Sequence, residues 1–245
     1  MSSLNNMPKT SSGKKPIDKI VVCGCSFSRP GQSGVDKVWS HYLEEALGVP
    51  VVNLTWESGG SNSEILRLLS EYVWTHPNDS SMVIAQWTTP DRIEFCHDDH
   101  TWYQIRQTDS QDGTPLPQEI ELKIEKLKES QAYTYSNSTY FWHFLQTLLA
   151  FDNIMKLNHC RYLQAYCVGS LIQDFIQGNK KLYFDPKTIY KIMNKTNWLF
   201  DDVLKADLNG MQFPTVSSED PHFNDQGHQQ LAKTFSTFIK HKGWL

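Results

Sequence analysis

The stretch that decides the fold is Ile20-Val21-Val22-Cys23-Gly24-Cys25-Ser26-Phe27-Ser28. Its first part is apolar and β-branched, and it ends abruptly in Gly-Cys-Ser. This pattern predicts a buried strand that stops at a tight turn. Ser26 would then lie at the carboxyl end of the strand, where open α/β sheets bind their ligands. The stretch alone leaves two roles open for Ser26: a nucleophile, or a cap for a following helix.

The segments that follow alternate between helix and strand. Apolar residues at helical spacing predict helices over Asp36–Leu47 and Ser63–Trp74. Short apolar runs predict strands over Val49–Leu54 and Ser81–Trp87. Short connections between alternating strands and helices are typical of a parallel sheet with helices on both faces. We therefore expect a three-layer α/β/α sandwich with a parallel, flavodoxin-like sheet.

The alternation breaks after the third strand. Two short extended pieces, Arg92–Phe95 and Thr101–Arg106, flank a polar His97–His100 turn and predict a β-hairpin insertion. The pattern then resumes in four segments: helices over Glu119–Ser130, Tyr140–Leu157 and Gln229–Lys240, and a strand over Arg161–Val168. We expect a disordered tail over residues 1–17 and one domain over residues 18–245, with insertions at about 92–135 and 171–210.

Composition excludes several function classes. The chain has 245 residues, a net charge of -4 and no dense basic block, so we expect no nucleic-acid partner. Five cysteines, mostly in apolar runs, indicate reduced thiols, and Cys23-Gly24-Cys25 is too tightly spaced for a common zinc site. No apolar run is long enough to span a membrane, and Met1–Lys15 does not resemble a secretion signal. These features predict a cytoplasmic protein without a membrane partner or a metal.

A second informative segment, Glu219–His228, precedes the terminal helix and contains Asp220 and His222. A histidine that takes the proton of a serine hydroxyl needs a carboxylate on its other ring nitrogen, and Asp220 is placed to provide it. A structural role is also open, because Asn224 or Asp225 can cap the terminal helix without any catalysis.

The serine turn, a Gly-Gly-Ser-Asn loop at 59–62 and the late Asp-Pro-His together resemble the SGNH, or GDSL-like, hydrolase family. In that family a Gly-Asp-Ser motif after the first strand carries the nucleophile, and a late aspartate and histidine complete a triad. The resemblance implies Ser26 as nucleophile with His222 and Asp220. It also implies Gly60 and Asn62 as oxyanion-hole residues.

The chain departs from the family pattern at three places. Cys25 replaces the usual aspartate, and Glu219 stands where the family commonly has its acid, which leaves Glu219 as the alternative to Asp220. The asparagine that normally follows the third strand is absent, so Asn62 is the candidate substitute, with a hydroxyl of Thr88 or Thr89 as the alternative. We also expect Thr88 and Arg92 to face the substrate.

The resemblance implies a serine esterase or carbohydrate O-deacetylase that forms an acyl-enzyme and uses no cofactor. Its partner would be a small-molecule or carbohydrate ester. The alternative is a non-catalytic SGNH-like module for binding or assembly, such as a phage structural or accessory protein. Gly-Cys-Ser-Phe-Ser and Trp-Thr-Thr-Pro-Asp-Arg look similar to SGNH-like proteins encoded by phages. That alternative implies oligomer or virion assembly and a virion-associated location.

Overall fold

The computed structural model describes residues 16–55, 60–77, 79–90, 92–96, 102–105, 118–134, 137–167 and 185–245. A parallel sheet of four strands forms its centre, in the order β2-β1-β3-β6. The strands are β1 (Lys19–Gly24), β2 (Val51–Asn53), β3 (Ser81–Trp87) and β6 (Arg161–Tyr166). All of β3 and nearly all of β1 are buried, as expected for strands that are covered on both faces.

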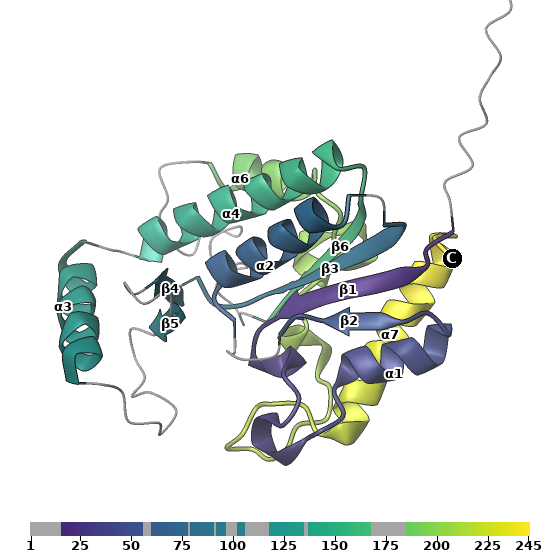
Figure 1. The fold of residues 1–245 in the computed structure, drawn as a ribbon, viewed down its shortest axis with the longest axis horizontal. Coiled ribbons are helices and arrows are strands. Elements are labelled where there is room, and N and C mark those ends of the chain that lie inside the picture. The colour runs from purple at the N-terminus through teal and green to yellow at the C-terminus, as the bar shows by residue number, and fades with distance from the viewer. Residues whose placement is uncertain are drawn as a thin grey trace, which may run out of the picture.

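Helices cover both faces of this sheet (Figure 1). On one face α1 (Trp39–Leu47) packs against α7 (Asp225–His241), and on the other α2 (Asn62–Thr75) packs against α4 (Asn137–Leu157). Two further helices, α3 (Gln118–Thr134) and α6 (Pro186–Met193), complete the described set. The predicted three-layer α/β/α sandwich is therefore confirmed. None of the described helices combines the length and apolar character needed to cross a bilayer.

The strand order places the topological switch point of the sheet at β1. The chain passes from β1 to β2 on one side and then returns to form β3 on the other side of β1. In doubly wound sheets, ligands bind at this switch point, outside the carboxyl ends of the strands. Ser26 follows β1 directly, in the short 3-10 helix η1 (Ser26–Ser28), and so lies at the switch point.

The predicted hairpin is confirmed. Strands β4 (Ile93–Cys96) and β5 (Trp102–Ile105) pair in antiparallel fashion, with Ile93 opposite Ile105. The predicted His97–His100 turn lies outside the described residues. So do residues 1–15 of the predicted tail, whereas Ile17 is buried in the core.

Several element boundaries differ from the sequence-based prediction. Helix α7 begins at Asp225, four residues before the predicted start, because the Asn224 side chain caps it by accepting the Gly227 N–H at 3.0 Å. Strand β2 covers only the middle of the predicted Val49–Leu54 segment.

Beyond residue 185, the region that no sequence pattern assigned contains α6 and three short 3-10 turns. These turns are η3 (Leu199–Asp201), η4 (Val203–Lys205) and η5 (Asn209–Met211). Two isolated parallel bridges, Gln164 with Trp198 and Tyr166 with Asp207, extend the sheet past β6. The sheet therefore continues in the flavodoxin-like direction without a regular fifth strand.

Candidate active site

A buried polar network fixes the turn that carries Ser26. Ser28 Oγ donates to Gln86 Oε1 and accepts the Trp39 Nε1–H at 2.9 Å. Gly24 lies against this network, because a Cβ there would be 2.5 Å from Ser28 Oγ and 2.7 Å from Gln86 Oε1. The turn therefore requires glycine before Cys25, and its position is set by β3 and α1 together.

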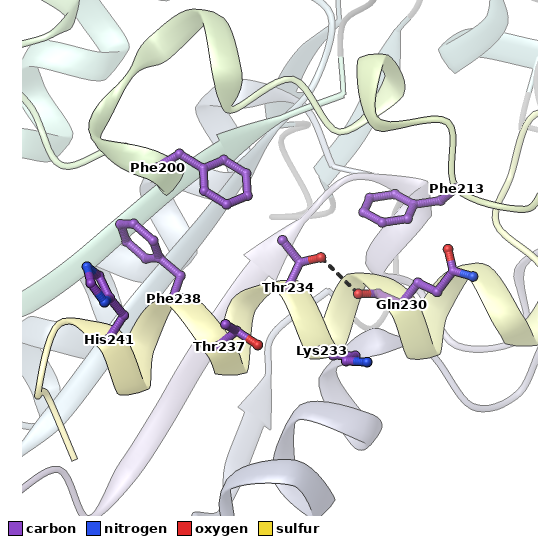
Figure 2. A pocket seen from close by; sticks show the side chains of 8 residues that line it. All are labelled: Phe200, Phe213, Gln230, Lys233, Thr234, Thr237, Phe238 and His241. Atoms are coloured by element: carbon purple, nitrogen blue, oxygen red, sulfur yellow. Dashed lines mark hydrogen bonds between the residues drawn. The ribbon is translucent and has the colours of Figure 1, made fainter.

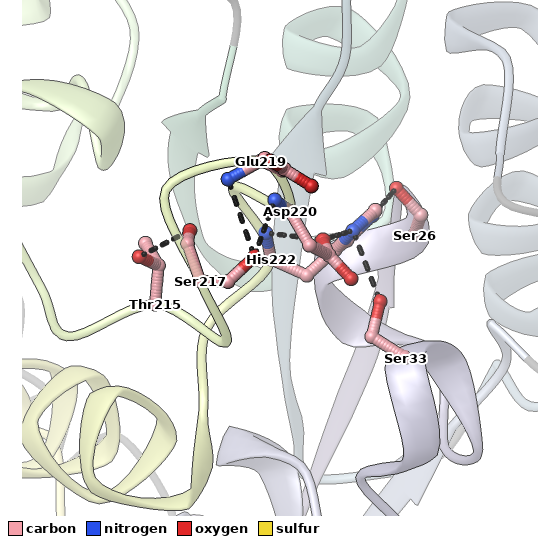
Figure 3. A network of polar contacts seen from close by, with 7 residues as sticks. All are labelled: Ser26, Ser33, Thr215, Ser217, Glu219, Asp220 and His222. Carbon is pink, nitrogen blue, oxygen red and sulfur yellow. Dashed lines mark hydrogen bonds and ion pairs between the residues drawn. The ribbon is translucent and has the colours of Figure 1, made fainter.

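Ser26, His222 and Asp220 lie within hydrogen-bond distance of one another in series (Figure 3). Ser26 Oγ is 2.9 Å from His222 Nε2, although the two residues are 196 positions apart in the sequence. His222 Nδ1 is 2.7 Å from Asp220 Oδ1. Because the carboxylate can only accept, the ring proton belongs on Nδ1, and the Nε2 lone pair faces the serine hydroxyl.

Backbone contacts hold the segment that carries His222. The Val216 N–H donates to the His222 carbonyl at 2.8 Å, and the Asp220 N–H donates to Ser217 Oγ at 2.9 Å. The His222 ring lies 4.8 Å from the ring of Phe27, centroid to centroid, so the residue after Ser26 packs against the histidine.

Of the two candidate acids, Asp220 is the one that contacts the imidazole. Its Oδ1 also accepts the His222 backbone N–H at 3.0 Å. Glu219 is exposed, and its backbone N–H donates to Ser217 Oγ. The pKa of the Asp220 carboxyl is lowered to about 2, chiefly by a hydrogen bond from Ser33 and then by the backbone and ring N–H groups of His222. Asp220 is therefore ionised at neutral pH.

Gly60 lies against the end of β1. Its φ is +53°, and a Cβ there would be 2.3 Å from the Gly24 carbonyl oxygen and 3.3 Å from Cys25 Cα. Only glycine fits this contact, which brings the Gly60 backbone next to the turn that carries Ser26. Within the part of the chain that the structure describes, neither the Ser26 N–H nor the Gly60 N–H donates a hydrogen bond to protein.

Asn62, the other predicted oxyanion residue, is buried and bonds to the end of β3. Its Nδ2 donates to the Thr88 carbonyl at 3.0 Å and the Thr89 carbonyl at 3.3 Å. Its Oδ1 accepts the Thr88 N–H at 2.9 Å. The side-chain donors of Asn62 are therefore engaged with backbone in this structure, and the same bonds fix buried Thr88 beside the nucleophile turn.

The charge of Arg92 acts on Cys25, the residue before Ser26. A hydrogen bond with the Cys167 thiol lowers the pKa of the Cys25 thiol, and the positive charge of Arg92 acts in the same direction, against the effect of burial. The Arg92 backbone N–H donates to the Thr89 carbonyl at 3.3 Å. Thr88 and Arg92 thus lie at the same edge of the sheet as Ser26.

Sequence analysis missed Ser33, whose Oγ is 3.3 Å from His222 Nδ1. The only sequence signal is the glycine on each side of Gln32-Ser33, which indicates a turn but not its direction. His228, by contrast, lies in the first turn of α7, where its Nδ1 accepts the Trp39 N–H at 3.3 Å. It takes no part in the contact between Ser26 and His222.

A separate cavity of about 560 Å³ lies between α7 and the segment that carries Phe200 and Phe213 (Figure 2). Three phenylalanines, Phe200, Phe213 and Phe238, line it together with polar residues of α7. None of Ser26, Asp220 and His222 lines this cavity. Across the described ranges, no three His, Cys, Asp or Glu side chains are grouped as metal ligands.

No protein-family model matches this sequence, and no curated protein matches it. Among solved structures, the chain is similar to one from Desulfitobacterium hafniense DCB-2 described as "a putative lipolytic protein of G-D-S-L family". The TM-score is 0.51 at 13% sequence identity, and the match covers 90% of this chain and 99% of that chain. This likeness shows a shared fold: a parallel sheet flanked by helices, as the SGNH resemblance implied. The phage-related alternative stays a prediction.

Proposed function

We propose that this protein is a serine hydrolase that cleaves ester bonds through an acyl-enzyme on Ser26. One observation carries the proposal: Ser26 Oγ, the His222 ring and the Asp220 carboxylate are hydrogen-bonded in series at 2.9 and 2.7 Å. These are the contacts that general-base activation of a serine hydroxyl requires. The lipolytic description of the structural neighbour agrees with the proposal.

In the proposed reaction, His222 Nε2 accepts the Ser26 hydroxyl proton while Oγ attacks the carbonyl carbon of the ester. The Nδ1 proton stays on the ring, and Asp220 stabilises the imidazolium that forms. The tetrahedral intermediate then expels the alcohol, which takes the proton from Nε2, and leaves an acyl group on Ser26. A water molecule, deprotonated by His222, attacks this ester; the bond to Ser26 Oγ breaks, Oγ takes the proton back from Nε2, and the acid is released. The mechanism uses no metal or organic cofactor.

The developing oxyanion would be bound by the N–H groups of Ser26 and Gly60, which have no described protein acceptor. The Gly60 backbone lies against Gly24 and Cys25, the two residues before Ser26. Asn62 would join them by exchanging its longer bond, the one to Thr89 at 3.3 Å, for the oxyanion. Such donors act on charge that appears only in the transition state. Thr88 and Arg92 would contact the rest of a small-molecule or carbohydrate ester.

The test is labelling with a fluorophosphonate probe together with hydrolysis of p-nitrophenyl acetate. We expect the wild type to be labelled at Ser26, and Ser26→Ala to lose at least about a thousandfold in kcat. Ser218→Ala is the matched control, because this serine is exposed on the same loop as His222 and should leave activity unchanged. If wild type and Ser26→Ala hydrolyse p-nitrophenyl acetate with the same kcat, the proposal is wrong. A folded wild type that the probe does not label would favour the non-catalytic alternative.

A further inference from the structure

Ser33 adopts a backbone conformation that its side chain disfavours. It lies in the 3-10 turn η2 (Gln32–Gly34) with φ 53° and ψ 29°, which is the left-handed region. Non-glycine residues enter this region at a cost, and the surrounding structure must compensate for it. The Gly31 N–H bonds to the Val35 carbonyl at 2.9 Å, and so closes the turn around Ser33.

The strained turn directs the Ser33 hydroxyl toward the histidine of the proposed site. Ser33 Oγ is 3.3 Å from His222 Nδ1, on the side of the ring opposite to Ser26 (Figure 3). The segment that begins at Ser26 therefore contacts both ring nitrogens of His222, one through each serine. No other described side chain except Asp220 hydrogen-bonds to Nδ1.

The direction of these hydrogen bonds follows from the proton on Nδ1. His222 donates that proton to Asp220 at 2.7 Å, so Nδ1 has no lone pair to offer Ser33. Ser33 Oγ therefore accepts from Nδ1 in a bond shared with Asp220, which leaves the Ser33 hydroxyl hydrogen available to the carboxylate that is bound at the same nitrogen. A hydroxyl that donates to a carboxylate strengthens the preference for the ionised form.

We propose that Ser33 is a positioning residue of the site, which holds the Asp220 carboxylate against the His222 ring. The proposal rests on the proposed function, because it names a further member of the same hydrogen-bonded network. Asp220 needs such support: its side chain is one-third exposed and lies on a loop only two residues from His222. The left-handed backbone at Ser33 is strained because the turn must place this hydroxyl next to a carboxylate that is distant in the sequence.

Three variants separate the hydroxyl from the backbone. Ser33→Ala removes the hydroxyl and keeps the strain, and Ser33→Gly removes both. Ser33→Asn tolerates the left-handed conformation and retains a side-chain N–H donor. We expect Ala and Gly each to lower kcat by about tenfold with KM within about twofold, and Asn to recover part of the loss. Gln32→Ala, in the same turn, is the control and should behave as the wild type.

A second measurement does not depend on activity. Titration of the Asp220 carboxyl carbon by NMR should show its pKa rising from about 2 toward the ordinary aspartate value in Ser33→Ala and Ser33→Gly, but not in Gln32→Ala. A role for Ser33 in the fold of the turn alone would not move this titration.

The outcomes distinguish this proposal from the proposed function. If the wild type hydrolyses esters but Ser33→Ala and Ser33→Gly match it in kcat, the positioning role is wrong and the serine hydrolase stands. If Ser33→Gly alone regains wild-type kcat, the hydroxyl serves only to hold the strained turn in place, and the role in positioning Asp220 is also wrong. If the wild type is inactive and unlabelled, the proposed function fails. The Asp220 titration then still decides whether Ser33 holds the carboxylate.

Discussion

Two corners of the sheet's carboxyl edge are built in different ways. The acid–base corner consists of Ser26, Ser33, Asp220 and His222, which bond to one another through side chains from two distant segments of the chain. The oxyanion corner consists of Gly60, Asn62 and Thr88, where the side chain of Asn62 bonds to backbone groups at the end of β3.

Under the proposed function, the two corners differ in whether their hydrogen bonds must change when a substrate reacts. In the acid–base corner, hydroxyl, imidazole and carboxylate already contact one another in the order in which a proton would move. In the oxyanion corner, Asn62 must exchange an existing bond before it can bind a new charge. Substitutions in the acid–base corner should therefore lower kcat with little effect on stability, whereas substitutions in the oxyanion corner should change both.

The prediction with the largest expected fall in kcat tests the acid–base corner. Asp220→Asn removes the negative charge and favours the wrong ring tautomer, so we expect kcat to fall by about a thousandfold or more. Steady-state hydrolysis of p-nitrophenyl acetate measures it. Glu219→Gln is the matched control, because this neighbouring acid is exposed, and we expect its kcat to stay within about twofold. A larger loss in Glu219→Gln than in Asp220→Asn would reverse the assignment of the acid.

Asn62→Ala tests the oxyanion corner. If Asn62 binds the oxyanion, we expect kcat to fall by about a hundredfold. The free energy of unfolding should fall as well, because the buried Thr88 N–H loses its acceptor. Steady-state kinetics and urea unfolding separate the two effects, with Ser63→Ala, exposed at the next position, as control. A loss of stability with kcat unchanged would restrict Asn62 to a structural role.

The third prediction concerns the loss of stability at acid pH, which His228 should cause from outside the acid–base corner. Burial lowers the pKa of His228 to about 4, from an ordinary value near 6.5. The unfolded state then binds more protons between these values, so stability is full above pH 6.5 and is lost as the pH falls to 4. The expected loss over that window is about 3 kcal/mol.

Urea unfolding at a series of pH values measures this effect. In His228→Asn, which keeps a short acceptor for the Trp39 N–H, the decline between pH 6.5 and 4 should be smaller. An identical decline in wild type and His228→Asn would show that other groups cause it.

The last prediction compares the loss of stability caused by two glycine substitutions. Gly60→Ala combines a left-handed backbone with a Cβ 2.3 Å from the Gly24 oxygen, so we expect a loss of stability of about 3 kcal/mol. Gly48→Ala has the same conformational strain at φ 65° with nothing within 4 Å of the new Cβ, and should cost only about 1 kcal/mol. Thermal unfolding measures both. Equal losses would mean that Gly60 is not pressed against β1.

The strands and the acid–base corner could be predicted because their signals are local. The run before Gly24 marks β1, and the position of a residue just after a parallel strand fixes where its side chain lies. The Asp-Pro-His spacing, together with the resemblance to the SGNH family, likewise predicts Asp220 and His222. Their approach to Ser26, although distant in sequence, follows from the layout of the fold.

The remaining features depend on tertiary contacts that no local pattern encodes. The bonds of Asn62 join α2 to the end of β3, and the sequence does not indicate that Thr88 backbone would occupy its amide. Ser33 contacts the site through a strained turn whose direction only the packed structure sets. Near the end of the sheet, Trp198 is placed by the Met193 carbonyl, which accepts its indole N–H at 2.7 Å, rather than by any periodic run.

The 196-residue separation of Ser26 from His222 also bears on how the protein is made. The ribosome adds Ser26 early and adds the imidazole of His222 only 196 residues later. Until α7 docks on α1, Ser26 is an ordinary alcohol with no base beside it. Under the proposed function, a nascent chain that stops short of His222 has no hydrolytic site, and any such activity would report that the two segments have come together.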